Sequence, residues 1–160
     1  MTTALPAVNP TSEGCGTVHG APRLWLRLEG ATLFVGTLIA YAETGHSWWL
    51  VAIVVLLPDL FMVGYLGGTR VGALMYNVAH ATPVPAALAG MGWWQHWPAL
   101  VAIALVWLAH IGLDRLMGYG LKYSDHFQHT HLGWIGHRPD PHRVQERRSQ
   151  LGTTTQEHTQ

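Results

Sequence analysis

The chain has 160 residues, of which 11% are charged, whereas about 25% is usual in a soluble globular domain. Acidic and basic residues balance at nine each, so there is no net positive charge to attract nucleic acid, and the single cysteine excludes an intramolecular disulfide. Apolar residues make up 49% of the chain, and eight residues are tryptophan. This composition is typical of an integral membrane protein.

Two polar segments flank the apolar part of the chain. Residues 1–22 and residues 137–160 have the composition of disordered tails, so the single predicted domain covers residues 23–136. The first tail has no basic stretch followed by an apolar run. We therefore expect no cleavable signal peptide, and the first apolar helix would act as the insertion signal.

The apolar part contains four long runs, at residues 24–42, 48–66, 71–92 and 97–117. Each is long enough to cross the roughly 30 Å hydrocarbon core of a membrane as a helix. Open strands would leave unpaired backbone groups in lipid, so helices are the physical choice. Because the connections are short, the predicted fold is an all-α, antiparallel bundle of four transmembrane helices.

Prolines predict irregularities in two of these helices. Pro58 predicts a kink in the second run, because proline has no amide hydrogen to donate to the helix. Pro83 and Pro85 interrupt the third run, which is either a proline-containing helix stabilised by its neighbours or a broken, re-entrant helix.

The basic residues predict the orientation of the bundle. The first and third connections contain no Lys or Arg, whereas the N-terminal end, the second connection and the C-terminal region do. Both termini are therefore expected on the cytoplasmic side of the plasma membrane. Tryptophans agree with this orientation, because five of them gather at the opposite interface: Trp48, Trp49, Trp93, Trp94 and Trp97.

The second and fourth runs share a sequence pattern. Leu50–Ile53 recurs as Leu100–Ile103, and Asp59 then corresponds to Asp114. Two duplicated helical hairpins would explain the pattern, since membrane proteins are often built from repeats. Chance similarity between apolar helices is the alternative.

Six polar side chains lie inside the runs, where a charge at the bilayer centre costs about 2.5–3.5 kcal/mol. At 1.5 Å per residue, all six fall in the cytoplasmic half of the predicted bundle, and every helix contributes. His110 and Asp114 are four residues apart and share a helix face. The same holds for Asn77 and His80, which are three residues apart. The complete set is Glu29, Asp59, Asn77, His80, His110 and Asp114.

Two histidines with carboxylates suit a divalent transition metal such as zinc or iron. The candidate metal ligands are His80, His110 and Asp114, and the candidate general base is Glu29 or Asp59.

Three other interpretations of these polar residues stay open. The same groups suit a proton relay. A structural hydrogen-bonded network that includes Asn77 and Arg115 would need no ligand. A haem held between His80 and His110 is a minor variant.

The segment after the fourth run contains three histidines in six residues: His126, His129 and His131. Their spacing fits no standard metal site. Apolar residues nearby, such as Phe127 and Trp134, predict a loop lying on the membrane surface.

A longer pattern is recognisable at this end of the chain. Residues 107–123, WLAHIGLDRLMGYGLKY, with Thr130–Gly133 and Ile135–Gly136, resemble the bacterial membrane family catalogued as domain of unknown function 4260. The resemblance covers about residues 24–136 and implies a small multi-helix membrane protein without an assigned activity. It places motif residues on the positions singled out above: Glu29, Asp59, Asn77, His80, His110, Asp114 and Arg115. His126 is atypical of the motif.

Three functions remain in competition. The first is a membrane-embedded, metal-dependent hydrolase, although no nucleophile elbow, phosphate loop or zincin motif supports it. The second is a proton-coupled transporter or relay, which would need to form homo-oligomers through small-residue surfaces such as Gly64, Gly68 and Gly112. The third is a non-catalytic membrane subunit. Whether the chain is an enzyme, and on which substrate, is not decided by the sequence.

Overall fold

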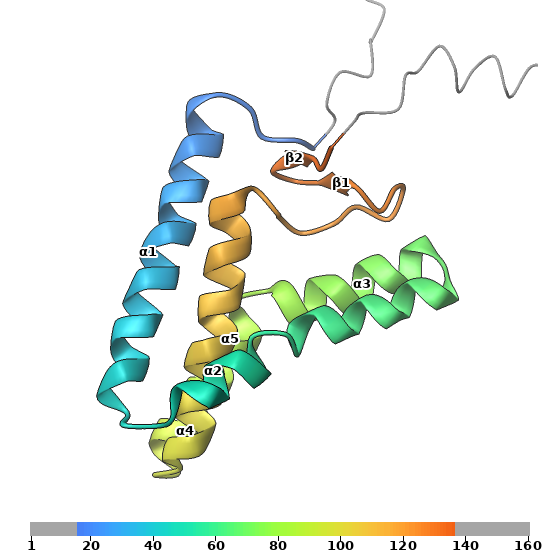
Figure 1. Cartoon of the computed structure of the whole chain (residues 1–160). Helices are drawn as coiled ribbons and strands as arrows, with labels where there is room; N and C mark the ends of the chain where they lie inside the picture. The colour runs from blue at the N-terminus through green and yellow to red at the C-terminus, as the bar shows by residue number, and fades with distance from the viewer. Residues whose placement is uncertain (1–15, 137–160) are drawn as a thin grey trace, which may run out of the picture.

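The computed structural model describes residues 16–136, so most of the two predicted tails lies outside the described residues. This range contains five α-helices, one 3-10 helix and a short antiparallel hairpin (Figure 1). In chain order these are α1 (Ala21–Glu43), α2 (Trp48–Val54), η1 (Pro58–Gly67), α3 (Thr69–His80), α4 (Pro83–Trp94), α5 (Pro98–Met117), β1 (His129–Thr130) and β2 (Gly133–Trp134).

Three helical stretches are long and apolar enough to cross a membrane: Ala21–Glu43, Trp48–Gly67 and Pro98–Met117. Their outward side chains are largely apolar, as a lipid-facing surface requires. On α1, for example, Trp25 is 67% exposed and Ile39 is 61% exposed.

Helices α1 and α5 run antiparallel and form the most extensive contact between helices of the described chain (Figure 1). Glycines allow these two helices to approach closely, because they carry no side chain at the crossing. A Cβ atom added to Gly30 would lie 2.8 Å from the carbonyl oxygen of Gly112, and one added to Gly112 would lie 2.5 Å from the amide nitrogen of Phe34. Gly112 therefore packs against α1 of the same chain.

The second apolar run bends where its proline predicts. Helix α2 ends at Val54, a turn follows, and Pro58 is the first residue of η1. Figure 1 shows that η1 and α3 lie side by side as a hairpin that extends to one side of the α1–α5 pair. Gly68 makes the turn at its tip with a φ of 101°, a value that favours glycine. Gly64 packs inside the hairpin against Met75.

The third run is two helices rather than one. Ala81 is extended, with φ −86° and ψ 122°, and α4 begins at Pro83. Pro83 has no amide hydrogen to donate to the carbonyl oxygen of Ala79, four residues earlier, so the helix cannot continue through it. The Ala79 carbonyl accepts instead from Nε1 of Trp107 (2.6 Å). At 12 residues each, α3 and α4 span about 18 Å, which is less than the hydrocarbon core. The structure therefore differs from a bundle of four continuous helices, and the broken alternative describes the third run.

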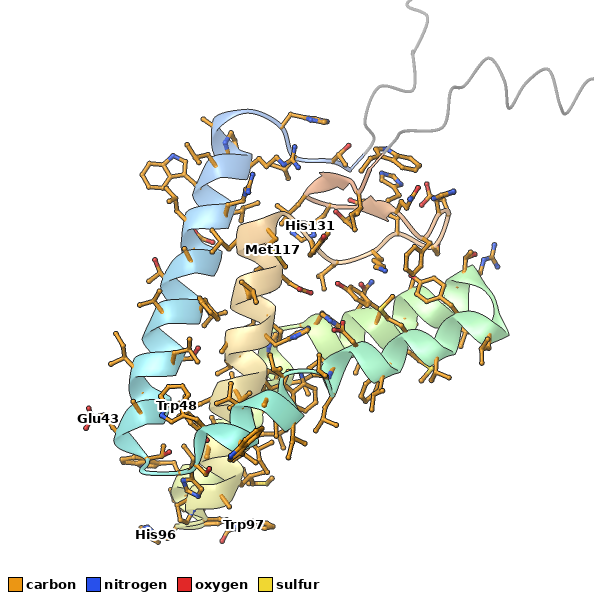
Figure 2. The ribbon with its side chains drawn as sticks, in the orientation of Figure 1. Glu43, Trp48, His96, Trp97, Met117 and His131 are labelled. Atoms are coloured by element: carbon orange, nitrogen blue, oxygen red, sulfur yellow. The ribbon has the colours of Figure 1, made fainter. Side chains whose placement is uncertain are left out.

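A small apolar core joins α1, α2 and α5 at one end of the molecule. It consists of Tyr41, Val54, Ala102 and Val106, and the Tyr41 hydroxyl donates a hydrogen bond to the carbonyl of Ser47 (2.6 Å). In Figure 2, Trp48 and Trp97 lie at this end, whereas Met117 and His131 lie at the opposite end. Five of the six exposed tryptophans therefore belong to segments at the end away from the C-terminal segment: Trp48, Trp49, Trp93, Trp94 and Trp97. The sixth, Trp25, lies in the first turns of α1.

The segment after α5 folds over the ends of the helices. Gly118, with a φ of 94°, ends α5, and β1 and β2 pair in a hairpin that buries Thr130 and Leu132 completely. The amide of Val18 donates to the carbonyl of His131 (2.8 Å), so residues just before α1 also join this layer. Sequence had predicted only a surface loop here.

This layer is expected to loosen in acid. The Leu121 amide donates to Nδ1 of His131 (2.9 Å), which requires a neutral ring. Burial, together with the Arg115 guanidinium, lowers the pKa of His131 below the usual 6.5. Because the unfolded chain takes up the proton first, the stability that this group contributes is present above pH 6.5 and is lost as pH falls.

Hydrogen exchange tests this expectation. After correction for the intrinsic rate, the Leu121 amide should exchange faster at about pH 5.5 than at about pH 7.5. In His131→Asn, which keeps an acceptor that does not titrate, the difference should shrink. Equal protection of wild type at both pH values would contradict the proposed coupling.

Candidate metal centre

The two histidines of the predicted set face each other where the η1–α3 hairpin meets α5. His80 is the last residue of α3, and His110 lies on α5; both are buried. Their Nε2 atoms are 3.1 Å apart, and the rings meet edge to face at 63°. This contact leaves no room for a haem plane between them, which removes the haem alternative.

A backbone contact determines which nitrogen of His80 is available. Nδ1 lies 2.9 Å from the carbonyl oxygen of Tyr76, and a carbonyl only accepts, so Nδ1 carries the hydrogen. In the neutral ring Nε2 then carries no hydrogen, and its lone pair points at His110. Metal-ligating histidines typically have their second nitrogen held in this way. The Tyr76 ring also stacks on the His80 ring at 3.7 Å.

Two carboxylates complete the cluster. Asp59 Oδ1 lies 3.5 Å from Nε2 of His80 and 3.7 Å from Nε2 of His110. Asp114 Oδ2 lies 3.6 and 3.7 Å from the same two atoms, and it accepts a hydrogen bond from the Tyr76 hydroxyl (3.3 Å). Asp59 is 46% exposed at its side chain, whereas Asp114 is 16% exposed. The cluster is thus open on the Asp59 side.

The spacing of these atoms, 3.1–3.7 Å, is close to that of a tetrahedral metal site. Zinc–nitrogen and zinc–oxygen bonds of about 2.0–2.2 Å place tetrahedral ligand atoms roughly 3.3–3.6 Å apart. Among the described residues, the donor atoms of Asp59, His80 and His110 all lie within 4.8 Å of one another. The distances from Asp114 Oδ2 to the two histidine nitrogens fall within the same limit. Nitrogen and carboxylate donors of this kind suit zinc or iron.

A small cavity borders the cluster on the Asp114 side. Its volume is about 10 Å³, which is about the space that one water molecule needs. Its wall includes His80, Asp114 and Arg115. A water molecule there would have polar partners next to the histidine pair.

The other predicted residues fall in different places. Asn77 pairs with the backbone of Lys122: its amide donates to the carbonyl (2.8 Å) and its oxygen accepts from the amide (2.7 Å). This bond fixes the C-terminal segment on α3. Arg115 borders the small cavity. Glu29 is exposed on α1 in a hollow lined by residues of α1 alone, and the described residues give it no hydrogen bond or ion pair.

The three C-terminal histidines do not join the cluster. His129 Nδ1 bonds to Asp125 (2.7 Å), and its ring stacks on Trp134 at 4.7 Å. His126 also packs against Trp134, and His131 accepts from the backbone. Their contacts are those of a folded surface hairpin.

Two residues beside the cluster were missed by sequence reasoning. Tyr76 is four residues before His80, and this helical spacing was a signal that could have placed it on the same face. Lys122 is 6% exposed, and its Nζ lies 4.4 Å from the Tyr76 ring centre and 3.5 Å from that of Phe127. A cation held by rings contributed by distant segments leaves no local signal in the sequence.

Comparison with known proteins gives a family but no activity. No curated protein and no solved structure matches the chain. Residues 23–135 match the model of a family described as a domain of unknown function, DUF4260. The match covers most of the chain, including every residue of the histidine–carboxylate cluster, and the chain belongs to this family.

Proposed function

We propose that the chain is an integral membrane protein that binds one divalent transition metal between His80 and His110 and uses it to hydrolyse a substrate. One observation carries the proposal. The two Nε2 atoms face each other at 3.1 Å with carboxylate oxygens 3.5–3.7 Å from both, and the bond from Nδ1 to Tyr76 leaves the His80 lone pair directed into the cluster.

The membrane part of the proposal is supported by the apolar surface. The apolar surface runs between two ends of the molecule. One end carries five exposed tryptophans, and the other carries the C-terminal hairpin. Arg23, Arg27 and Arg115 lie toward the hairpin end, so we place both termini in the cytoplasm by the positive-inside rule. In this orientation α1 and α5 span the plasma membrane, and the metal centre lies in the cytoplasmic half.

The two carboxylates differ in their surroundings, and this difference assigns their roles. Among the described residues Asp59 has no hydrogen-bond donor other than the two histidines, so its carboxylate is free to bind the metal and we take it as the third ligand. Asp114 is steadied by the Tyr76 hydroxyl and borders the one-water cavity, so we take it as the group that accepts the proton of the attacking water. This assignment exchanges the roles expected from the sequence. The metal supplies a lowered pKa for bound water and a positive charge for the developing oxyanion.

A proton relay is the second candidate, and one observation favours it. Without a metal, the 3.1 Å contact between Nε2 of His80 and Nε2 of His110 is a hydrogen bond, and it continues the chain from Tyr76 through Asp114 toward Asp59. Such chains of ionisable groups carry protons in membrane proteins.

Metal analysis of the purified protein separates these candidates. We expect about one zinc or iron per chain after loading and gel filtration, and hydrolysis of nitrophenyl ester or phosphoester probes that a chelator stops and added metal restores. Asp59→Ala should lose metal, whereas Asp114→Asn should keep metal and lose activity. A chain that binds no metal under any loading condition overturns the hydrolase proposal and leaves the relay.

A further inference from the structure

Lys122 is a positive charge buried beside the cluster. Its main chain is held by the side chain of Asn77, and its Nζ lies over the rings of Phe127, Tyr76 and Tyr65, at 3.5, 4.4 and 5.3 Å from their centres. Aromatic faces attract a cation and replace part of the water that it has lost. The described residues give this ammonium group no ion pair with a carboxylate.

The field of this charge reaches the cluster. Tyr76 lies between Lys122 and the cluster. Its ring faces the Lys122 ammonium group and stacks on His80, and its hydroxyl donates to Asp114. Burial lowers the pKa of Lys122 to about 8, against the opposing pull of Asp114 and Asp59. Lys122 is therefore mostly protonated at neutral pH.

A count of charges then indicates which ligands the loaded centre prefers. The carboxylates of Asp59 and Asp114 neutralise a divalent ion, so Lys122 leaves one positive charge in excess. Arg115, which borders the cavity next to Asp114, adds to it. In a buried site such an excess is weakly screened and favours an anion.

The open side of the cluster faces an apolar surface. Asp59 is its exposed member, and its neighbours along the chain are exposed leucines: Leu56 at 63%, Leu57 at 44% and Leu60 at 65%. These residues belong to the second membrane-length stretch. A ligand that reaches Asp59 along this surface moves through lipid and needs an apolar portion of its own.

We propose that the centre binds an anionic amphiphile, a negatively charged headgroup on an apolar tail, which enters past Asp59 and is attracted by Lys122. The inference rests on the proposed metal centre and names the ligand class that this centre accepts. Lys122 is buried among the rings of Phe127, Tyr76 and Tyr65, so it acts on the ligand through its field, as a positioning residue.

Cobalt-loaded protein in nanodiscs provides the test, because the visible spectrum of Co²⁺ reports changes at the metal. Phosphatidylglycerol in a phosphatidylcholine disc should change the wild-type spectrum, whereas pure phosphatidylcholine, whose headgroup has the same phosphodiester but no net charge, should not. Lys122→Met should weaken the phosphatidylglycerol response about tenfold and keep the spectrum recorded in pure phosphatidylcholine, while Lys122→Arg should retain the response.

Four results would overturn the inference, and each contradicts a different part of it. An identical wild-type spectrum in both lipids would contradict anion selectivity, and this comparison needs no variant. Diethyl phosphate acting as well as the lipid at equal concentration removes entry from the bilayer. A Lys122→Met response equal to that of wild type removes the role of the lysine. Absence of any cobalt spectrum in wild type overturns the metal centre itself, and this inference with it.

Discussion

His110→Ala should release the metal and leave the helices in place. His110 supplies one of the two nitrogen donors of the cluster, and without it His80 is the one imidazole left beside the two carboxylates. Replacing even a supporting residue of a metal site costs about 10–100-fold in affinity, so losing a ligand should cost at least about 100-fold. The metal-to-protein ratio after gel filtration should fall from about one to near zero.

The matched control is His129→Ala. His129 is another histidine paired with an aspartate four residues away, but it lies in the surface hairpin, outside the cluster. This variant should keep its metal. Circular dichroism should show that both variants remain helical, which separates loss of a ligand from loss of the fold. Equal metal content in wild type and His110→Ala would show that the histidine pair is a hydrogen bond and no metal ligand.

The sequence predicts contacts within the site only between residues that share a helix. The pairing of His110 with Asp114 followed from their spacing of four, and the structure confirms that both face the same cluster. The approach of Asp59 and His80 to α5 could not be derived in this way. It depends on the breaks at Pro58 and before Pro83, which turn the η1–α3 hairpin aside (Figure 1). Asp59 near the start of η1 and His80 at the end of α3 then both lie next to α5.

Glu29 shows the limit of counting polar residues by depth. It lies at the expected level of α1, yet it is exposed. The next residue, Gly30, faces α5 in the glycine crossing. Because successive residues of a helix are about 100° apart, Glu29 is turned away from the cluster. A depth prediction therefore needs the direction of each side chain, which depends on the helix pairing.

The proposed duplication gains a structural parallel without being decided. Asp59 and Asp114, which the repeat equates, lie at nearly equal distances from the two Nε2 atoms of the histidine pair. The elements that carry them differ, since the second run is bent at Pro58 and α5 is continuous over 20 residues. A shared origin for the two aspartates stays a prediction.

Gly112→Ala should weaken the α1–α5 pair. The new methyl group would lie 2.5 Å from the amide nitrogen of Phe34 and 2.8 Å from the carbonyl oxygen of Gly30. Both are backbone atoms, so no side chain can rotate away, and the helices must separate. Overpacking of this kind costs about 1–3 kcal/mol, and we expect about 3 kcal/mol because backbone meets backbone.

Unfolding in mixed micelles, followed by tryptophan fluorescence, measures this cost, and Gly36→Ala is its control. Gly36 lies on the same helix pair but has no heavy atom within 4 Å of an added Cβ, so alanine there should be neutral or stabilising by up to about 1 kcal/mol. Gly112→Ala should also keep its metal, because two residues along a helix turn by about 200° and place Gly112 on the side of α5 opposite His110. Loss of stability without loss of metal would thus be the reverse of the His110→Ala result. If Gly112→Ala proved as stable as Gly36→Ala, α1 and α5 could not be in contact along this glycine crossing.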